Sequence, residues 1–228
     1  MGERGRWVPV WFLFTGGMIN YMDRSAVSVA APLLMRDLKL DAVQMGIIFS
    51  AFFAGYALFN FIGGYAADVL GPKRVFTVAM TVWSAFCGLT ATATGFVSLL
   101  FVRVVFGFGE GPFAAAANKA VRNWFPREQI ATAIGLANCG TPLGGAVAGP
   151  IVGWLALKCG WRASFIALGA IGLLWTLFWM IAVGDRRTIS TRNGANNPTP
   201  KLWFYLKQPG VIATAIAFSH TPTYSISF

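Results

Sequence analysis

Four charged residues lie where the chain is otherwise apolar enough to cross a membrane: Asp23, Arg24, Arg103 and Glu110. A charge at mid-bilayer costs about 2.5–3.5 kcal/mol on insertion scales, so such residues usually face a cavity or a partner. The two acids can carry protons, and the two arginines can hold an anion. These residues therefore predict a polar site in the middle of a membrane protein. The alternative is a purely structural ion-pair network that locks two helices together.

Two of these residues share one predicted helix. Arg103 and Glu110 are seven residues apart, which places them on one helix face, about 10 Å apart along the axis. Glycines surround them, and Pro112 can loosen the hydrogen-bond ladder where a cavity satisfies the freed groups. The other two are adjacent, in the run Tyr21-Met-Asp23-Arg24 of the first apolar segment.

The composition predicts an all-α membrane protein. Of 228 residues, 56% are hydrophobic and 11% are charged, whereas a soluble domain has about 25% charged residues. The net charge is +10, but the basic residues are spread over loops without interleaved aromatics, so we expect no nucleic-acid partner. The three cysteines have no metal-site or disulfide spacing. We expect no metal and no cofactor.

Seven apolar segments are long enough to span a bilayer. The predicted helices cover residues 7–31, 44–67, 75–93, 98–120, 130–157 and 161–183, with a seventh from about 210 to 228. The first is expected to end before Pro32. Residues 1–183 then form a six-helix bundle, the polar residues 184–207 a cytoplasmic linker, and residues 208–228 the start of the seventh helix. This last segment holds His220, whose ordinary pKa suits proton transfer but which is more often structural.

The loop charges predict the orientation. With the N-terminus inside, eleven basic residues lie on the cytoplasmic side: Arg4, Arg6, Lys73, Arg74, Arg122, Arg127, Arg186, Arg187, Arg192, Lys201 and Lys207. Four lie outside: Arg36, Lys39, Lys158 and Arg162. The positive-inside rule therefore favours a cytoplasmic N-terminus, and we expect the lipid bilayer of a cell membrane, the bacterial inner membrane, as the location.

The loop after the second helix carries a spaced set of residues, Gly64, Asp68, Gly71, Lys73 and Arg74. The spacing resembles the cytoplasmic loop signature of the major facilitator superfamily and departs from it at Val69, where the family often has a basic residue. Glycine permits close helix packing, the acid can pair with a neighbouring helix or loop, and the basic pair anchors the inner face. The resemblance implies that these five residues form a cytoplasmic gate motif.

Further motifs resemble one branch of that superfamily, the anion:cation symporters. They are the Tyr21-x-Asp23-Arg24 motif, the Arg103–Glu110 spacing, Asn118 and the loop Trp124-Phe125-Pro126. The resemblance implies two six-helix halves around a central cavity. This chain would supply the first half, the linker and most of the seventh helix, so a missing C-terminal half is expected as its partner.

The resemblance implies a secondary transporter and not an enzyme. It would move an organic anion, a sugar acid or another carboxylate, by proton-coupled symport with alternating access. Arg24 would bind the carboxylate through its two-pronged guanidinium, with Tyr21 and Asn118 adding hydrogen bonds. Asp23 and Glu110 would be the proton-coupling acids, and Arg103 the counter-charge.

Other functions stay open at this point. The run from Gly145 to Gly153 resembles a fifth-helix motif of superfamily antiporters, which leaves exchange of organic anions or phosphate esters possible, although close packing alone explains such a run. An inactive or sensor-like fragment is a further alternative. An intramembrane aspartyl protease is disfavoured, because its two carboxyls must share a proton, and here each acid is accompanied by an arginine.

Overall fold

The computed structural model describes residues 4–183. The predicted linker, the seventh helix and His220 lie outside this part of the chain. The described residues form helices and one short 3-10 turn, with no strand among them, as the sequence predicts. The helices are α1 (Arg4–Leu38), α2 (Ala42–Leu70), α3 (Pro72–Leu89), α4 (Phe96–Glu110), α5 (Phe113–Trp124), α6 (Arg127–Cys159) and α7 (Trp161–Ala182).

These seven helices correspond to the six predicted spans, because α4 and α5 form one interrupted span. Pro112 has no N–H group, so the ladder is broken there, although Gly111 and Pro112 keep helical dihedral angles. Within residues 4–183, five helical segments are long and apolar enough to cross a membrane: 42–70, 72–92, 96–124, 127–159 and 161–182. The remaining helix, α1, contains Asn20, Asp23 and Arg24, which lower its mean hydropathy.

The prediction that the first helix ends before Pro32 is wrong. Helix α1 continues through Pro32 to Leu38 and also contains Pro9. A proline in a membrane-spanning helix is tolerated when neighbouring groups satisfy the carbonyl that it leaves free. Beyond this end, Asp41 accepts a hydrogen bond from the Gln44 backbone, 2.7 Å long, and begins α2 with a capping box.

Two short turns depend on glycine conformation. Gly71 joins α2 to α3 with φ of 88°, and Gly160 joins α6 to α7 with φ of 85°. Both angles lie in the left-handed region that glycine adopts without steric cost. Each turn is followed at once by the next helix, so each joins adjacent spans within a single residue.

Helix α1 packs directly against the backbone of α6. Gly140 and Gly144 face the backbone carbonyls of Phe14 and Met18, and a Cβ at either glycine would overlap these atoms. The buried face of α6 is a stripe of small residues at helical spacing: Ala133, Ala137, Gly140, Gly144, Ala148, Val152 and Ala156. Small residues let membrane helices approach closely, so the composition of α6 determines its pairing with α1.

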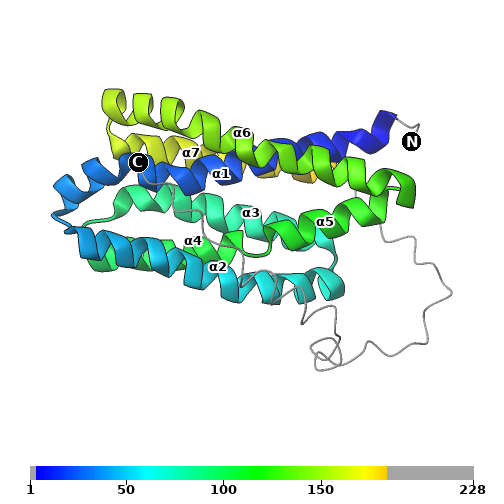
Figure 1. Cartoon of the computed structure of the whole chain (residues 1–228), viewed down its shortest axis with the longest axis horizontal. Coiled ribbons are helices and arrows are strands. Elements are labelled where there is room, and N and C mark those ends of the chain that lie inside the picture. Colours follow the sequence, from blue (N-terminus) through cyan, green and yellow to red (C-terminus); the bar gives the residue numbers. More distant parts are fainter. Residues whose placement is uncertain (1–3, 184–228) are drawn as a thin grey trace, which may run out of the picture. The chain divides into compact units, whose positions relative to one another are not determined.

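The same device packs α4 against α2 and α3 against α7. A Cβ on Gly55 of α2 would lie 2.6 Å from the Val104 carbonyl of α4, and one on Gly169 of α7 would lie 2.6 Å from the Gly88 nitrogen of α3. Gly109 of α4 likewise faces the Trp83 backbone of α3, at 2.6 Å. Figure 1 shows α1, α6 and α7 running together in the upper part of the view, with α2, α3 and α4 below them.

Tryptophan side chains add polar links between the helices. The Trp175 indole of α7 donates a 2.9 Å hydrogen bond to Thr15 of α1. Trp179 donates one of 3.2 Å to Thr77 of α3, and Trp161 donates one of 3.0 Å to Asp37 at the end of α1. A buried indole N–H needs an acceptor, so these bonds fix α7 against both neighbours.

Candidate functional site

The centre of the bundle contains an ion pair between α1 and α4. The Arg24 guanidinium donates two hydrogen bonds to Oε1 of Glu110, one from Nε at 2.8 Å and one from Nη2. The Glu110 side chain is only 1% exposed, whereas the Arg24 side chain is 25% exposed. Oε2 of Glu110 is buried and has no hydrogen-bond partner among the described residues. The acid is therefore enclosed, while its arginine remains accessible.

Aromatic rings from two helices surround the Arg24 guanidinium. Its central carbon lies 5.3 Å from the ring centre of Tyr21, 5.1 Å from that of Phe52 and 4.9 Å from that of Tyr56. Such rings stabilise a cation through their negative faces, and the effect grows when water is excluded. Phe52 and Tyr56 are one helical turn apart on α2, so this helix holds the guanidinium on a side that Glu110 leaves free.

Asp23 points to a different neighbour from Arg24. Its carboxylate accepts a 3.2 Å hydrogen bond from the Trp83 indole of α3, and its residue is 0% exposed. Successive helix residues are about 100° apart around the axis, so Asp23 and Arg24 cannot face the same partner. Oδ1 of Asp23 has no hydrogen-bond partner in the described part of the chain. Two buried acids thus each have one unpaired oxygen.

Arg103 is buried, at 3% exposure, without an acid bonded to it in residues 4–183. It donates a 3.3 Å hydrogen bond to Thr90 and lies over the rings of Phe106 and Phe165, 4.8 and 5.6 Å from their centres. Its Nε has no partner among these residues. The guanidinium therefore still has an N–H group available to bind an anion.

Both arginines line one cavity of about 200 Å³ between α1, α2 and α4. Ser25 and Ser28 contribute hydroxyl groups, and the remaining lining is apolar: Val27, Ile48, Phe49, Phe52, Phe53 and Phe106. Among residues 4–183, no carboxylate lines it. Two guanidinium groups, two hydroxyls and phenyl rings form an environment suited to a small polar anion.

The structure does not bring all of the predicted site residues together. Tyr21 contacts Arg24 through its ring. Asn118 lies on α5, two turns beyond Glu110, and its side chain makes no hydrogen bond among the described residues. It also does not line the cavity that the two arginines share.

The predicted cytoplasmic gate residues lie at one end of the bundle. Asp68, near the end of α2, forms an ion pair with Lys119 of α5. Gly71 makes the turn, Lys73 and Arg74 begin α3, and Gly64 lies one turn before Asp68 with Ala115 3.9 Å from its Cβ position. The loop signature thus connects α2, α3 and α5 at the end where α1 begins.

Sequence reasoning missed several residues that contact these charged groups: Phe52, Tyr56, Trp83 and Thr90. All are uncharged and lie within apolar segments, so nothing local distinguishes them from residues that only pack. Tyr56 and Trp83 carried one usable signal, because a polar aromatic tip in mid-span needs a hydrogen-bond partner. Within residues 4–183, no group of His, Cys, Asp or Glu has the arrangement of a metal site.

Comparison with known proteins gives a consistent result. Residues 13–228 match the family described as Major Facilitator Superfamily. The chain is 50% identical over 216 residues to a hexuronate transporter of Bacillus subtilis (strain 168), covering 92% of this chain and 51% of that protein. It is 33% identical over 176 residues to a hexuronate transporter of Escherichia coli (strain K12), covering 77% of this chain and 41% of that protein. The chain thus spans about half the length of these relatives.

A solved structure shows the same fold. A bacterial homologue of the human lysosomal transporter Spinster, inward-facing and unoccupied, aligns with a TM-score of 0.77 at 23% identity, covering 96% of this chain and 50% of that one. The family match and these relatives confirm the resemblance to the superfamily, and the solved structure shows the shared fold.

Proposed function

Because the chain belongs to the Major Facilitator Superfamily, we propose that it forms the anion-binding part of a proton-coupled transporter for hexuronates or related sugar acids. The observation that carries the proposal is the cavity that Arg24 and Arg103 line, to which the described part of the chain contributes no carboxylate. The substrate class comes from the relatives, since the protein that is 50% identical is named a hexuronate transporter.

Arg24 is the group that we propose for the substrate carboxylate. A planar guanidinium matches a carboxylate by two parallel hydrogen bonds. In this structure both of its bonds go to one oxygen of Glu110. A carboxylate substrate would therefore compete with Glu110 for the same donors, while the ring faces of Tyr21 and Phe52 keep the cation in place.

Glu110 is the acid that we propose to couple substrate to protons. When a proton binds its unpaired Oε2, the side chain loses its charge and its attraction for Arg24 weakens. Arg24 is then free for the incoming anion. Asp23 is the second candidate, because its Oδ1 is also unpaired in the described residues. We propose the inner membrane as the location, with the basic end of the bundle in the cytoplasm.

Uptake by a completed protein tests this proposal. Residues 1–228 are joined to the part of the Bacillus subtilis relative that they do not span, and the fusion is produced in cells that lack their own hexuronate transporter. We expect saturable uptake of galacturonate or glucuronate that a protonophore abolishes. Uptake that ignores the protonophore but requires a second anion inside would favour exchange. No binding and no uptake of any sugar acid would contradict the proposal.

A further inference from the structure

A second cavity of the bundle lies away from the charged site. It is a groove of about 410 Å³ between α2 and α3, with Phe108, Gly109 and Pro112 of the interrupted span as its floor. We call it the α2–α3 groove. Of the described side chains that line it, only Arg74 is charged or polar. We propose that this groove binds one acyl chain of a phospholipid with a net negative headgroup, and that Arg74 contacts the phosphate.

The groove has the length of one leaflet. Along α2 it extends from Phe59 to Leu70, which corresponds to about 16 Å at ~1.5 Å per residue. Half of a typical hydrocarbon core is about 15 Å. An acyl chain that enters from one membrane surface therefore fits between the ends of the groove.

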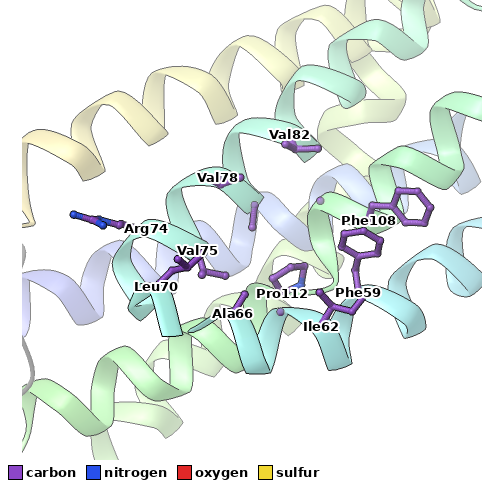
Figure 2. Close-up of a pocket in the computed structure, with 13 residues that line it drawn as sticks. Phe59, Ile62, Ala66, Leu70, Arg74, Val75, Val78, Val82, Phe108 and Pro112 are labelled. Atoms are coloured by element: carbon purple, nitrogen blue, oxygen red, sulfur yellow. The ribbon is translucent and has the colours of Figure 1, made fainter. Parts of the chain in front are cut away.

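The two ends of the groove differ in chemistry. Figure 2 shows Phe59, Phe108 and Pro112 together at one end, and Arg74 beyond Leu70 and Val75 at the other. The rings of Phe59 and Phe108 are stacked 4.5 Å apart, and they lie at the depth of Glu110. The end at Phe59 and Phe108 is thus apolar and deep, while the end at Arg74 is basic.

Glycine and proline create the space. Gly63 lies against Pro112, and a Cβ at Gly63 would lie 2.5 Å from the Pro112 Cα. Because neither position projects a long side chain, this part of the groove lining is not filled from within. The walls are exposed apolar residues: Ile62 at 43%, Val78 at 63% and Leu70 at 57%. In a bilayer, lipid tails cover such walls.

The charges favour a lipid over an apolar peptide. Arg74 is exposed and has no ion-pair partner among residues 4–183. Lys73 precedes it at the same end. A phosphate placed there satisfies the guanidinium by charge-assisted hydrogen bonds, whereas a purely apolar helix would leave it unmatched. This site is separate from the proposed anion cavity, which none of the groove residues lines.

Native mass spectrometry of delipidated residues 1–228 in detergent tests the proposal. The probes are phosphatidylglycerol, phosphatidylcholine and inorganic phosphate. We expect one phosphatidylglycerol per chain, bound about fivefold more tightly than phosphatidylcholine, which corresponds to about 1 kcal/mol for one basic residue near an anionic surface. Phosphate alone should not displace it. Displacement by phosphate would show an ion site without a tail and would overturn the proposal.

Matched variants separate headgroup from tail. Arg74→Gln should bind phosphatidylglycerol no more tightly than phosphatidylcholine. Arg74→Lys should retain the preference for phosphatidylglycerol, and Arg122→Gln at the same end should leave it unchanged.

Val78→Trp should fill the groove and remove both lipids, while Ile166→Trp on α7 should not. Val82→Phe is a smaller filling, for use if Val78→Trp fails to fold by circular dichroism. Equal effects of Arg74→Gln and Arg122→Gln on the lipid preference would overturn the proposal. Undiminished lipid binding by both Val78→Trp and Val82→Phe would also overturn it.

The completed fusion adds one more outcome. If a protein segment, and not lipid, occupies the groove, phosphatidylglycerol bound to the fusion will be insensitive to Val78→Trp, and the lipid assignment is wrong. Uptake of sugar acids is measured on the same samples. Because Val78 and Arg74 do not line the anion cavity, the lipid result stands or falls independently of the transport proposal.

Discussion

Arg24 is bonded to Glu110 but remains partly accessible, and this combination determines what its replacement should do. A lysine keeps the charge but offers a single point donor instead of a planar fork. Each hydrogen bond to a charged group contributes about 1.5–3 kcal/mol. In the completed fusion, Arg24→Lys should therefore reduce hexuronate affinity by about 10- to 100-fold. Arg122→Lys, at an exposed position on α5, is the control, and near-normal uptake by Arg24→Lys would remove this residue from the site.

Glu110 gives a prediction about coupling. Glutamine imitates the protonated acid, so Glu110→Gln should abolish accumulation driven by a proton gradient while exchange of labelled for unlabelled substrate continues. Uptake with an imposed pH difference measures the gradient-driven accumulation, and counterflow in proteoliposomes measures the exchange. Glu128→Gln, an exposed acid at the start of α6, serves as control. Gradient-driven accumulation that survives in both Glu110→Gln and Asp23→Asn would show that neither acid couples transport.

The sequence predicts the depth of the charged residues better than their partners. Asp23, Arg103 and Glu110 are buried as expected, because an apolar segment around a charge constrains where that charge lies. The pairing of Arg24 with Glu110 is not predictable from the sequence. Adjacency suggests Asp23 as the partner of Arg24, and helical spacing suggests Arg103 as the partner of Glu110. The partner depends on how α1 packs against α4, and that packing involves contacts far along the chain that no local pattern encodes.

At the scale of elements, the contact of α1 with α6 gives a stability prediction. A side chain at Gly140 would overlap the Phe14 carbonyl, so Gly140→Leu should force the helices apart and destabilise the bundle by about 3 kcal/mol, the upper end of the overpacking range. Gly135→Leu is the matched control, because a Cβ there meets nothing within 4 Å. Thermal unfolding in detergent measures both, and equal melting temperatures would contradict this account of the interface.

The outer contact of α1 with α7 gives a pH dependence. Arg162 and the Trp161 indole both donate hydrogen bonds to Asp37. These bonds, that of Arg162 above all, lower the pKa of Asp37 below its ordinary value. The ionised form is therefore favoured in the folded state, and its stabilising effect exists above the unfolded pKa, near 3.9. It is lost as the pH falls through the native pKa. The wild type should have a higher melting temperature than Asp37→Asn at pH 7, and the difference should shrink as the pH falls below about 3.9.

A constant difference between the two proteins from pH 7 to pH 3 would contradict this role for Asp37. Glu128→Gln controls for general effects of removing a carboxylate, since Glu128 has no ion-pair partner within the described residues.

Element boundaries show where sequence reasoning is weak. Pro32 was expected to end the first helix, but a membrane-spanning helix tolerates the missing N–H when its surroundings satisfy the freed carbonyl. Pro112 was expected only to loosen the fourth span, and it interrupts the ladder between α4 and α5. The same residue type thus has opposite outcomes, because its effect depends on packing that no local pattern encodes.

At the scale of the whole molecule, the charges at the two ends predict the orientation. Lys73, Arg74, Lys119, Arg122 and Arg127 lie at the end where α1 begins, and Cys159 lies at the opposite end, exposed, at the close of α6. In intact cells, a membrane-impermeant maleimide should label Cys159, and Cys159→Ser should lose the label. A cysteine at Gln129, on the basic end, should react only after permeabilisation. The reverse pattern would show that the N-terminus faces outward.

The glycine contacts divide the bundle into two stiff bodies. In one, α1 lies backbone to backbone with α6; in the other, Gly55, Gly109 and Gly169 join α2, α4, α3 and α7 in the same way. Such contacts have no rotamers to change, so they resist shear. Between the bodies lie longer side chains, including Arg24 with Glu110, Asp23 with Trp83, and Thr15 with Trp175. The polar site therefore lies where the two groups of helices meet through side chains. Any change of charge or ligand there acts on the contact at which one group can most easily shift against the other.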